Sequence, residues 1–131
     1  MSFMVWTEEG YGTTVAACDA QHQELFNRVN ALNTAVSDGG RPEIGNRLDS
    51  LIDYVVEHFT DEERLMEEKG YEDLPNHRKV HADLVNTCTD LQKKFHANEA
   101  EVDSSVMKFI KDWLDNHIPI VDRQYGPVLS S

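Results

Sequence analysis

Four stretches of this chain repeat apolar residues at helical spacing, and each carries at least one possible metal ligand on the same apolar face. The first stretch follows Asp19 and extends to Val36, and the others cover 43–69, 77–95 and 106–117. A helix with one apolar face must bury that face against other elements. Four such helices with short connections favour an all-α fold, an up-down-up-down antiparallel four-helix bundle.

Breaks rich in glycine, proline or polar residues separate the four stretches. They are Ser37–Pro42, Gly70–Pro75 and the acidic loop 96–103. Glycine permits a positive φ angle, and proline is well placed at the start of a helix. The connections are therefore short enough to keep consecutive helices antiparallel.

The length of 131 residues suits one domain with one core, so we expect a single domain over 1–131. It divides into an N-terminal arm (1–18), a bundle (19–122) and a C-terminal tail (123–131). Trp6 and Tyr11 should pack the arm on the bundle, and Asp19 is a candidate cap for the first helix. Tyr125–Pro127 is expected to end regular structure.

Composition excludes several classes of function. The chain has 24 acidic against 12 basic residues and a formal charge of -12, which disfavours nucleic-acid and anionic-membrane partners, since both select basic surfaces. We expect no nucleic-acid partner and no insertion into a membrane. It has no apolar run long enough to span a membrane and no signal-like start, which favours a cytoplasmic location. Cys18 and Cys88 are expected to be reduced, with Cys88 filling space in the core.

His77 and His81 lie four residues apart, and on an α-helix this means about 400° of rotation and about 6 Å of rise. Both rings then leave the same face, which suits two ligands of one metal ion. Leu84, Cys88 and Leu91 continue that face inward. The alternative is two polar residues that align by chance, but a buried imidazole needs a partner and a metal ion is one.

His58 and Glu62 have the same spacing, on a face that also carries Leu51 and Val55. The alternative is a solvated ion pair, which is common on exposed helices. A carboxylate on a buried face is costly unless it is paired or bound to metal. His22 alone would be an ordinary core histidine and gains weight from the others. The neighbouring acids are expected to be solvated; they are Asp61, Glu63, Glu67 and Glu68.

His117 and Asp122 lie five residues apart, so a straight α-helix would place them about 140° out of line. Pro119 stands between them, lacks an N–H and clashes with the carbonyl four residues back. We expect this proline to distort the helix so that Asp122 reaches inward. The alternative is that Asp122 caps or solvates the end of the bundle.

Together the candidates supply five imidazoles and two carboxylates. Their number exceeds the four ligands of a tetrahedral zinc site. The set suits two metal ions that accept imidazole, among them iron, zinc and copper. It lacks the Glu-x-x-His pairs of ferritin-like di-iron bundles.

The spacing of these residues resembles that of the hemerythrin family at every ligand position. The motifs are His22, His58-x-x-x-Glu62, His77-x-x-x-His81 and His117-x-x-x-x-Asp122. The flanks resemble the bacterial members, as in Asp19-Ala-Gln-His22, His58-Phe-Thr-Asp-Glu62-Glu63 and Trp113-Leu-Asp-Asn-His117-Ile118. The likeness covers nearly the whole chain. It departs from the family at Tyr71-Glu72, where the family often has Tyr-Pro.

The resemblance implies two iron ions joined by an oxo or hydroxo bridge. His77, His81 and His117 would hold one iron, His22 and His58 would hold the other, and Glu62 and Asp122 would bridge them. These ligands and the solvent-derived bridge leave one position open, on the iron with two histidines. Dioxygen would bind at that position.

The same resemblance implies an apolar wall around the dioxygen, formed by Phe59, Trp113, Leu114 and Ile118. We expect no tyrosine, lysine or further histidine to act as a proton donor on the inner face. The expected function is reversible dioxygen binding for transport, storage or delivery by a monomer that is not an enzyme. An oxygen-consuming enzyme is a possible partner. The alternatives are a free-standing dioxygen or NO sensor and an iron-dependent oxidase or peroxide-handling enzyme.

Overall fold

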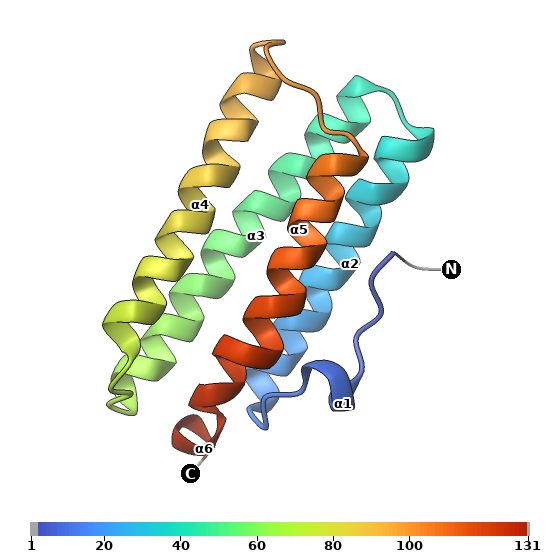
Figure 1. Ribbon diagram of the computed structural model, residues 1–131. Coiled ribbons are helices and arrows are strands. Elements are labelled where there is room, and N and C mark those ends of the chain that lie inside the picture. Colours follow the sequence, from blue (N-terminus) through green and yellow to red (C-terminus); the bar gives the residue numbers. More distant parts are fainter. Residues whose placement is uncertain (1–2, 131) are drawn as a thin grey trace.

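Four long helices run alternately up and down and form the expected bundle (Figure 1). The computed structural model describes residues 3–130, so Met1, Ser2 and Ser131, which we assigned to the arm and tail, lie outside it. The long helices are α2 (Ala16–Asp38), α3 (Arg41–Glu68), α4 (Leu74–His96) and α5 (Ser104–Asn116). Over the described residues there is no β-strand, and the all-α prediction is confirmed.

The helix boundaries follow local chemistry. Pro42 and Pro75 occupy the first turns of α3 and α4, where a missing N–H costs little. Gly70 has a φ of 68° just after α3, which only glycine adopts readily. The carboxylate of Asp103 accepts the N–H groups of Ser105 and Val106 and so caps α5.

The prediction that Asp19 caps the first long helix is wrong. α2 begins three residues earlier, at Ala16, and its cap position is Val15, which has no capping side chain. The Asp19 carboxylate instead accepts the backbone N–H of Thr13 at 2.9 Å and its hydroxyl at 2.8 Å. Asp19 therefore fastens the arm to the bundle.

The arm packs on the bundle as expected. It contains the short helix α1 (Glu8–Tyr11). The Tyr11 ring meets Phe26 edge-on at 4.8 Å, and its hydroxyl donates to Asp115 at 2.6 Å. Met4 is buried, and its backbone exchanges two hydrogen bonds with the amide of Asn30.

Regular structure does not end at Tyr125, contrary to the prediction. A π-helical turn η1 (His117–Val121), a 3-10 turn η2 (Asp122–Tyr125) and a short helix α6 (Gly126–Leu129) follow α5 directly. A Cβ atom on Gly126 would lie 2.3 Å from the carbonyl oxygen of Thr13, so this glycine lets the tail pack against the arm. Tyr125 and Leu129 are buried there.

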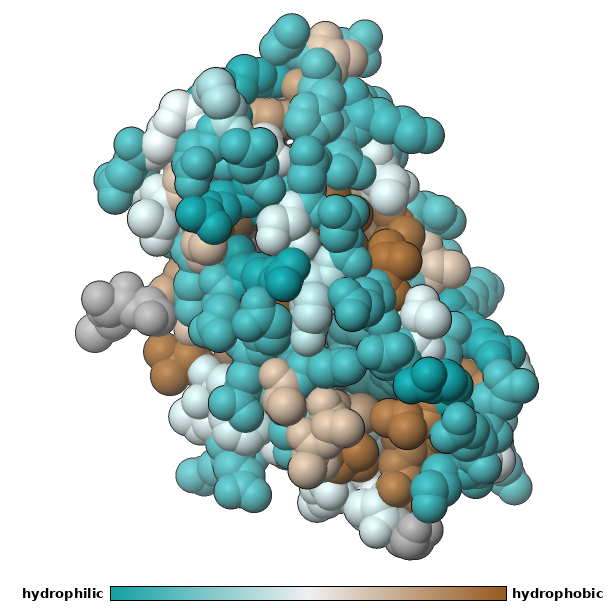
Figure 2. Space-filling model, turned by 180° about the vertical axis from the view of Figure 1, so that it is seen from behind, coloured by the Kyte–Doolittle hydropathy of each residue, from teal (hydrophilic) through white to brown (hydrophobic). Residues whose placement is uncertain are grey.

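Polar side chains cover most of the face shown in Figure 2, with small apolar patches between them. Cys18 and Cys88 are both free thiols, as expected; Cys18 is buried and Cys88 half-buried against the core. None of the helices in the described part is both long and apolar enough to cross a membrane.

Candidate metal centre

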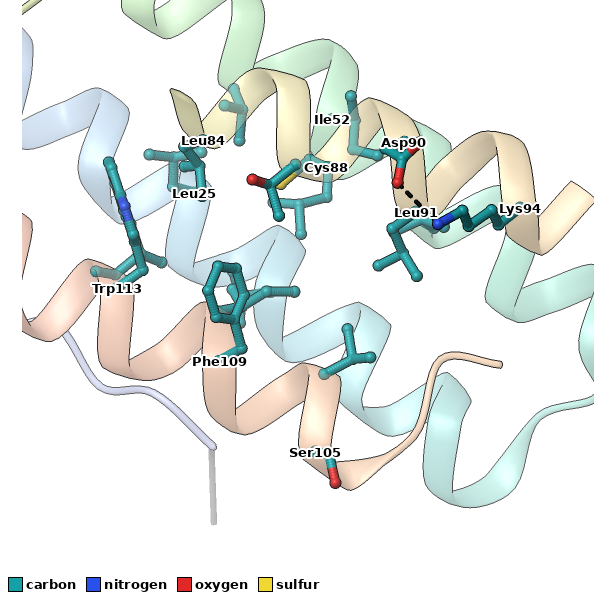
Figure 3. Close-up of a pocket in the computed structure, with 18 residues that line it drawn as sticks. Leu25, Ile52, Leu84, Cys88, Asp90, Leu91, Lys94, Ser105, Phe109 and Trp113 are labelled. Atoms are coloured by element: carbon teal, nitrogen blue, oxygen red, sulfur yellow. Dashed lines mark ion pairs between the residues drawn. The ribbon is translucent and has the colours of Figure 1, made fainter. Parts of the chain in front are cut away.

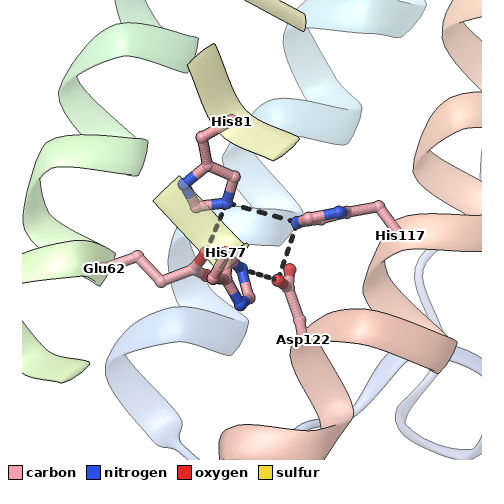
Figure 4. Close-up of side chains that lie close together, drawn as sticks. All are labelled: Glu62, His77, His81, His117 and Asp122. Carbon is pink, nitrogen blue, oxygen red and sulfur yellow. Dashed lines mark hydrogen bonds and ion pairs between the residues drawn. The ribbon is translucent and has the colours of Figure 1, made fainter. Parts of the chain in front are cut away.

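All seven predicted metal ligands are buried and meet between the four long helices near one end of the bundle. Each is at most 4% exposed. Their ligand atoms form two groups that share one carboxylate, and within each group these atoms lie within 4.8 Å of one another. The groups are Glu62, His77, His81, His117 and Asp122, and His22, His58 and Glu62; Figure 4 shows the first.

The two oxygens of Glu62 face different histidines. Oε2 lies 3.2 Å from Nε2 of both His22 and His58. Oε1 lies 3.3 Å from Nε2 of His81 and 3.6 Å from that of His77. Glu62 thus stands between a pair of histidines on one side and further histidines on the other.

Asp122 divides its oxygens in the same way. Oδ1 lies 2.9 Å from Nε2 of His77 and 2.8 Å from Nε2 of His117. Oδ2 lies 3.2 Å from Nε2 of His22. Both carboxylates therefore face two sets of imidazoles at once, which is an arrangement suited to bridging two cations.

The π-helical turn brings Asp122 inward. The N–H of Asp122 bonds to the carbonyl of His117 five residues back, as well as to Ile118. This wider turn places residues five apart on one face, which an α-helix cannot do. The expected distortion is confirmed and takes the form of a π turn that contains Pro119.

Two residues outside the ligand set contact the Nδ1 atoms of ligand histidines, on the side of the ring away from the cluster. Nδ1 of His58 lies 2.6 Å from Oε1 of Gln21, and Nδ1 of His81 lies 2.9 Å from Oε2 of Glu63. Such contacts fix the ring orientation and leave Nε2 free to bind metal. Our expectation that Glu63 is solvated was wrong, because it lies beside His81. In retrospect, its position next to Glu62 at the edge of the buried face was the only signal.

Tyr125 was also missed by the sequence analysis. Its side chain is fully buried, and its hydroxyl donates to Oε2 of Glu62 at 2.7 Å. The ring stacks on His77 with a centroid distance of 5.8 Å. A tyrosine hydroxyl therefore does lie on the inner face, where none was expected as a proton donor, and it donates to Glu62. Burial raises the pKa of Tyr125, which keeps the phenol protonated and able to donate.

Aromatic rings cover one side of the cluster. Phe59 stacks flat on His81 at a centroid distance of 3.7 Å, and Trp113 stacks on His117 at 4.2 Å. Leu114 and Ile118 are buried and belong to the same core cluster as Phe59. The four residues predicted to form an apolar wall thus pack together, two of them directly on the histidines.

The charges of the cluster are mutually stabilised. Burial would raise the pKa of Glu62 and Asp122, but the surrounding imidazoles outweigh it and hold both carboxyls below their ordinary pKa. Burial would lower the pKa of His22 and His77, but the two carboxylates raise it to about 9. The carboxylates are therefore ionised, and a cation that binds here displaces protons from imidazoles.

The buried donor atoms of the cluster are better satisfied by a bound cation than by one another. Several of its buried polar atoms have no hydrogen-bond partner, although they lie close to one another; they include Glu62 Oε1, His77 Nε2 and both carboxylate oxygens of Asp122. Buried polar atoms are rarely left unsatisfied, because desolvation is costly. Imidazole and carboxylate donors aimed at common points satisfy metal ions such as iron. The fold and site define a helical bundle with a buried centre for two metal ions.

Comparison with known proteins identifies the family. A model of the hemerythrin HHE cation binding domain matches residues 13–129. The chain is 52% identical to a bacteriohemerythrin of Methylococcus capsulatus over the full length of both. It is 35% identical to a myohemerythrin of Theromyzon tessulatum, over 82% of this chain and 78% of the relative. A crystal structure of wild-type hemerythrin superposes with a TM-score of 0.97 at 52% identity, over 99% of this chain and 100% of that one.

This chain belongs to the hemerythrin family, as its ligand spacing indicated. Its cofactor is accordingly a di-iron centre, for which the buried cluster supplies histidine and carboxylate donors. It is a di-iron protein that binds dioxygen.

Proposed function

We propose that this protein is a dioxygen carrier or store, which binds dioxygen at the di-iron centre and releases it unchanged. The observation that carries the proposal is the division of the oxygens of Glu62 and Asp122 between two sets of histidines. This arrangement would hold two iron ions. An iron pair so held supplies reversible binding of dioxygen.

We assign the individual ligands from this division. His77, His81 and His117 hold one iron ion, and His22 and His58 hold the other. Glu62 and Asp122, whose oxygens face both sets of histidines, would serve both ions. The ion held by His22 and His58 would have one imidazole fewer than the other, so dioxygen would bind there.

The protein residues around the centre favour release over reaction. Phe59 and Trp113 stack on ligand histidines, and Leu114 and Ile118 fill the space beside them. An apolar wall excludes water and protons, which would otherwise promote irreversible oxidation of the iron. The Tyr125 hydroxyl is engaged by Glu62. This favours a carrier over an oxidase or peroxide-handling enzyme.

Repeated oxygenation tests the carrier role. The protein is loaded with Fe(II) without air, exposed to dioxygen and degassed, while the charge-transfer absorbance is followed. We expect the colourless form to return over many cycles. Single-turnover oxidation would contradict the carrier role, and sustained consumption of a reductant would contradict it and favour the enzymatic alternative. A partner protein that binds only the oxygenated form would support the sensor.

Ligand variants test the residue assignment. Glu62→Ala and His77→Ala each remove a ligand, so both should lose iron when the metal content per chain is measured. His96→Ala is the control, because His96 lies at the surface beside Asp49, with Nε2 2.8 Å from the carboxylate. It should keep both iron ions. Equal iron loss in all three variants would contradict the assignment.

We propose further that residues 1–131 form a single domain that acts as a cytoplasmic monomer and delivers dioxygen to an oxygen-consuming enzyme. The net charge of -12 supports the monomer, since like-charged surfaces repel. Sedimentation of the iron-loaded protein at rising concentration tests this. A stable dimer would contradict it.

A further inference from the structure

A cavity of about 390 Å³ lies between α4 and α5 (Figure 3). Protein interiors are close-packed and hold few voids larger than a water molecule. The volume falls within the range of small-molecule sites. None of the metal ligands lines the cavity, but Trp113 and Leu114 of the apolar wall lie at one end of it.

Apolar side chains from all four long helices line this cavity. Leu25, Leu48 and Ile52 form part of its floor and are at most 5% exposed. Phe109 stands on α5 at the mouth and is 46% exposed. An apolar cavity of this kind is not stabilised by ordered water, since water needs polar partners. Its occupant must be apolar.

The shape of the cavity favours a linear occupant. On α4 the lining runs from Leu84 to Lys94, and on α5 from Ser105 to Leu114. Ten residues of α-helix rise about 15 Å, so the cavity is long and lies along the two helices. One end meets Trp113 and Leu114, and the other meets Lys94 and Ser105.

The charges at the rim of the cavity determine which polar group a linear occupant can carry at its end. Nζ of Lys94 lies 3.2 Å from Oδ2 of Asp90, so the two charges cancel at the mouth. Lys94 is therefore not free to pair with a carboxylate at the end of the occupant. The net charge of -12 also repels anions. An uncharged head group meets neither obstacle.

We propose that the α4–α5 cavity binds an uncharged molecule with a linear aliphatic chain, such as a medium-chain alcohol. The chain lies along the apolar floor, and the head stays at the rim near Lys94. The occupant contacts none of the proposed metal ligands, but one end of it meets Trp113 and Leu114, which belong to the apolar wall of the metal centre.

Calorimetric titration of the iron-loaded protein with decanol tests the proposal. We expect saturable binding of one decanol per chain, at least tenfold tighter than binding of decanoate. Cys88→Phe places a ring in the cavity and should abolish the decanol binding, whereas Cys88→Ser is nearly isosteric and should preserve it. Absence of saturable binding, or binding that survives Cys88→Phe in a folded protein, would overturn the proposal.

A rim variant tests the choice of head group without disturbing the core. Asp90 is exposed, and Asp90→Asn leaves Lys94 without its partner. Decanoate binding should then tighten by up to about fivefold, the range of an exposed ion pair, while decanol binding stays unchanged. If decanoate already binds the unmodified protein as well as decanol, the uncharged head is wrong. If the cavity is instead covered by a second copy of the chain, the protein sediments as a dimer that Phe109→Glu dissociates, and this also overturns the proposal.

Discussion

Glu63 contacts a ligand histidine but belongs to no ligand set. Its Oε2 atom lies 2.9 Å from Nδ1 of His81. Glu63→Ala removes this acceptor and frees the imidazole to rotate, so iron affinity should fall about 10- to 100-fold. Competition with a chelator of known affinity measures the change.

Glu67 provides the matched control for Glu63. Both carboxylates contact Arg78, but only Glu63 also contacts a histidine. The Glu67 side chain is 68% exposed, and a surface ion pair contributes about 0–1 kcal/mol. Glu67→Ala should therefore leave iron affinity unchanged. Equal losses in the two variants would mean that Arg78, and not His81, mediates the effect.

The sequence predicts the metal ligands better than it predicts the residues that hydrogen-bond to them. His77 and His81 could be found because four-residue spacing on an apolar face has a direct meaning on a helix. Gln21 and Tyr125 could not, because the groups they contact, His58 and Glu62, come from another element, α3. Such contacts depend on how helices are placed in space, which local spacing does not encode.

The π turn is the element on which the ligand set depends. Pro119→Ala supplies an N–H and removes the ring, so ordinary α-helical bonding becomes possible from His117 onward. An α-helical continuation would turn Asp122 about 140° away from His117. We expect iron affinity to fall at least about tenfold, as for other losses of ligand orientation, when measured by chelator competition.

Pro127→Ala serves as the control for the π turn. Pro127 is exposed and occupies the first turn of α6, where an added N–H does not compete with an existing bond. It should leave iron binding unaltered. Unchanged iron binding in Pro119→Ala would show that packing of η2 and α6 on the arm, rather than the proline, imposes the π turn.

Helix bodies were predicted from apolar spacing, whereas some ends were not. Asp19 has the chemistry of a helix cap, yet it serves the arm, because Thr13 offers it two donors. The tail continues past Tyr125 because burial of Tyr125 and Leu129 stabilises turns that local propensity does not favour. Ends depend on tertiary contacts, and these were not visible in the local pattern.

At the scale of the molecule, the bundle encloses a cluster that needs its metal. Seven polar side chains are buried at one end, several with atoms that lack a hydrogen-bond partner. Desolvation of such atoms opposes folding unless a cation binds them. The apolar core along the rest of the bundle must offset this cost in the metal-free protein. The stability of the folded protein should therefore depend on bound iron more strongly than the stability of a protein whose metal site lies at the surface.

Removal of iron tests this dependence. A ligand that binds only the folded state stabilises it by about 4 kcal/mol when its free concentration is a thousand times Kd. Iron-loaded protein should therefore unfold at a clearly higher temperature than protein treated with a chelator, in thermal scans followed by circular dichroism. His96→Ala should show the same difference as the unmodified protein, since it lies outside the cluster. In His77→Ala the difference should shrink, because one ligand is gone. If the unmodified protein melted at the same temperature with and without iron, the bundle would hold the seven side chains in place without the metal.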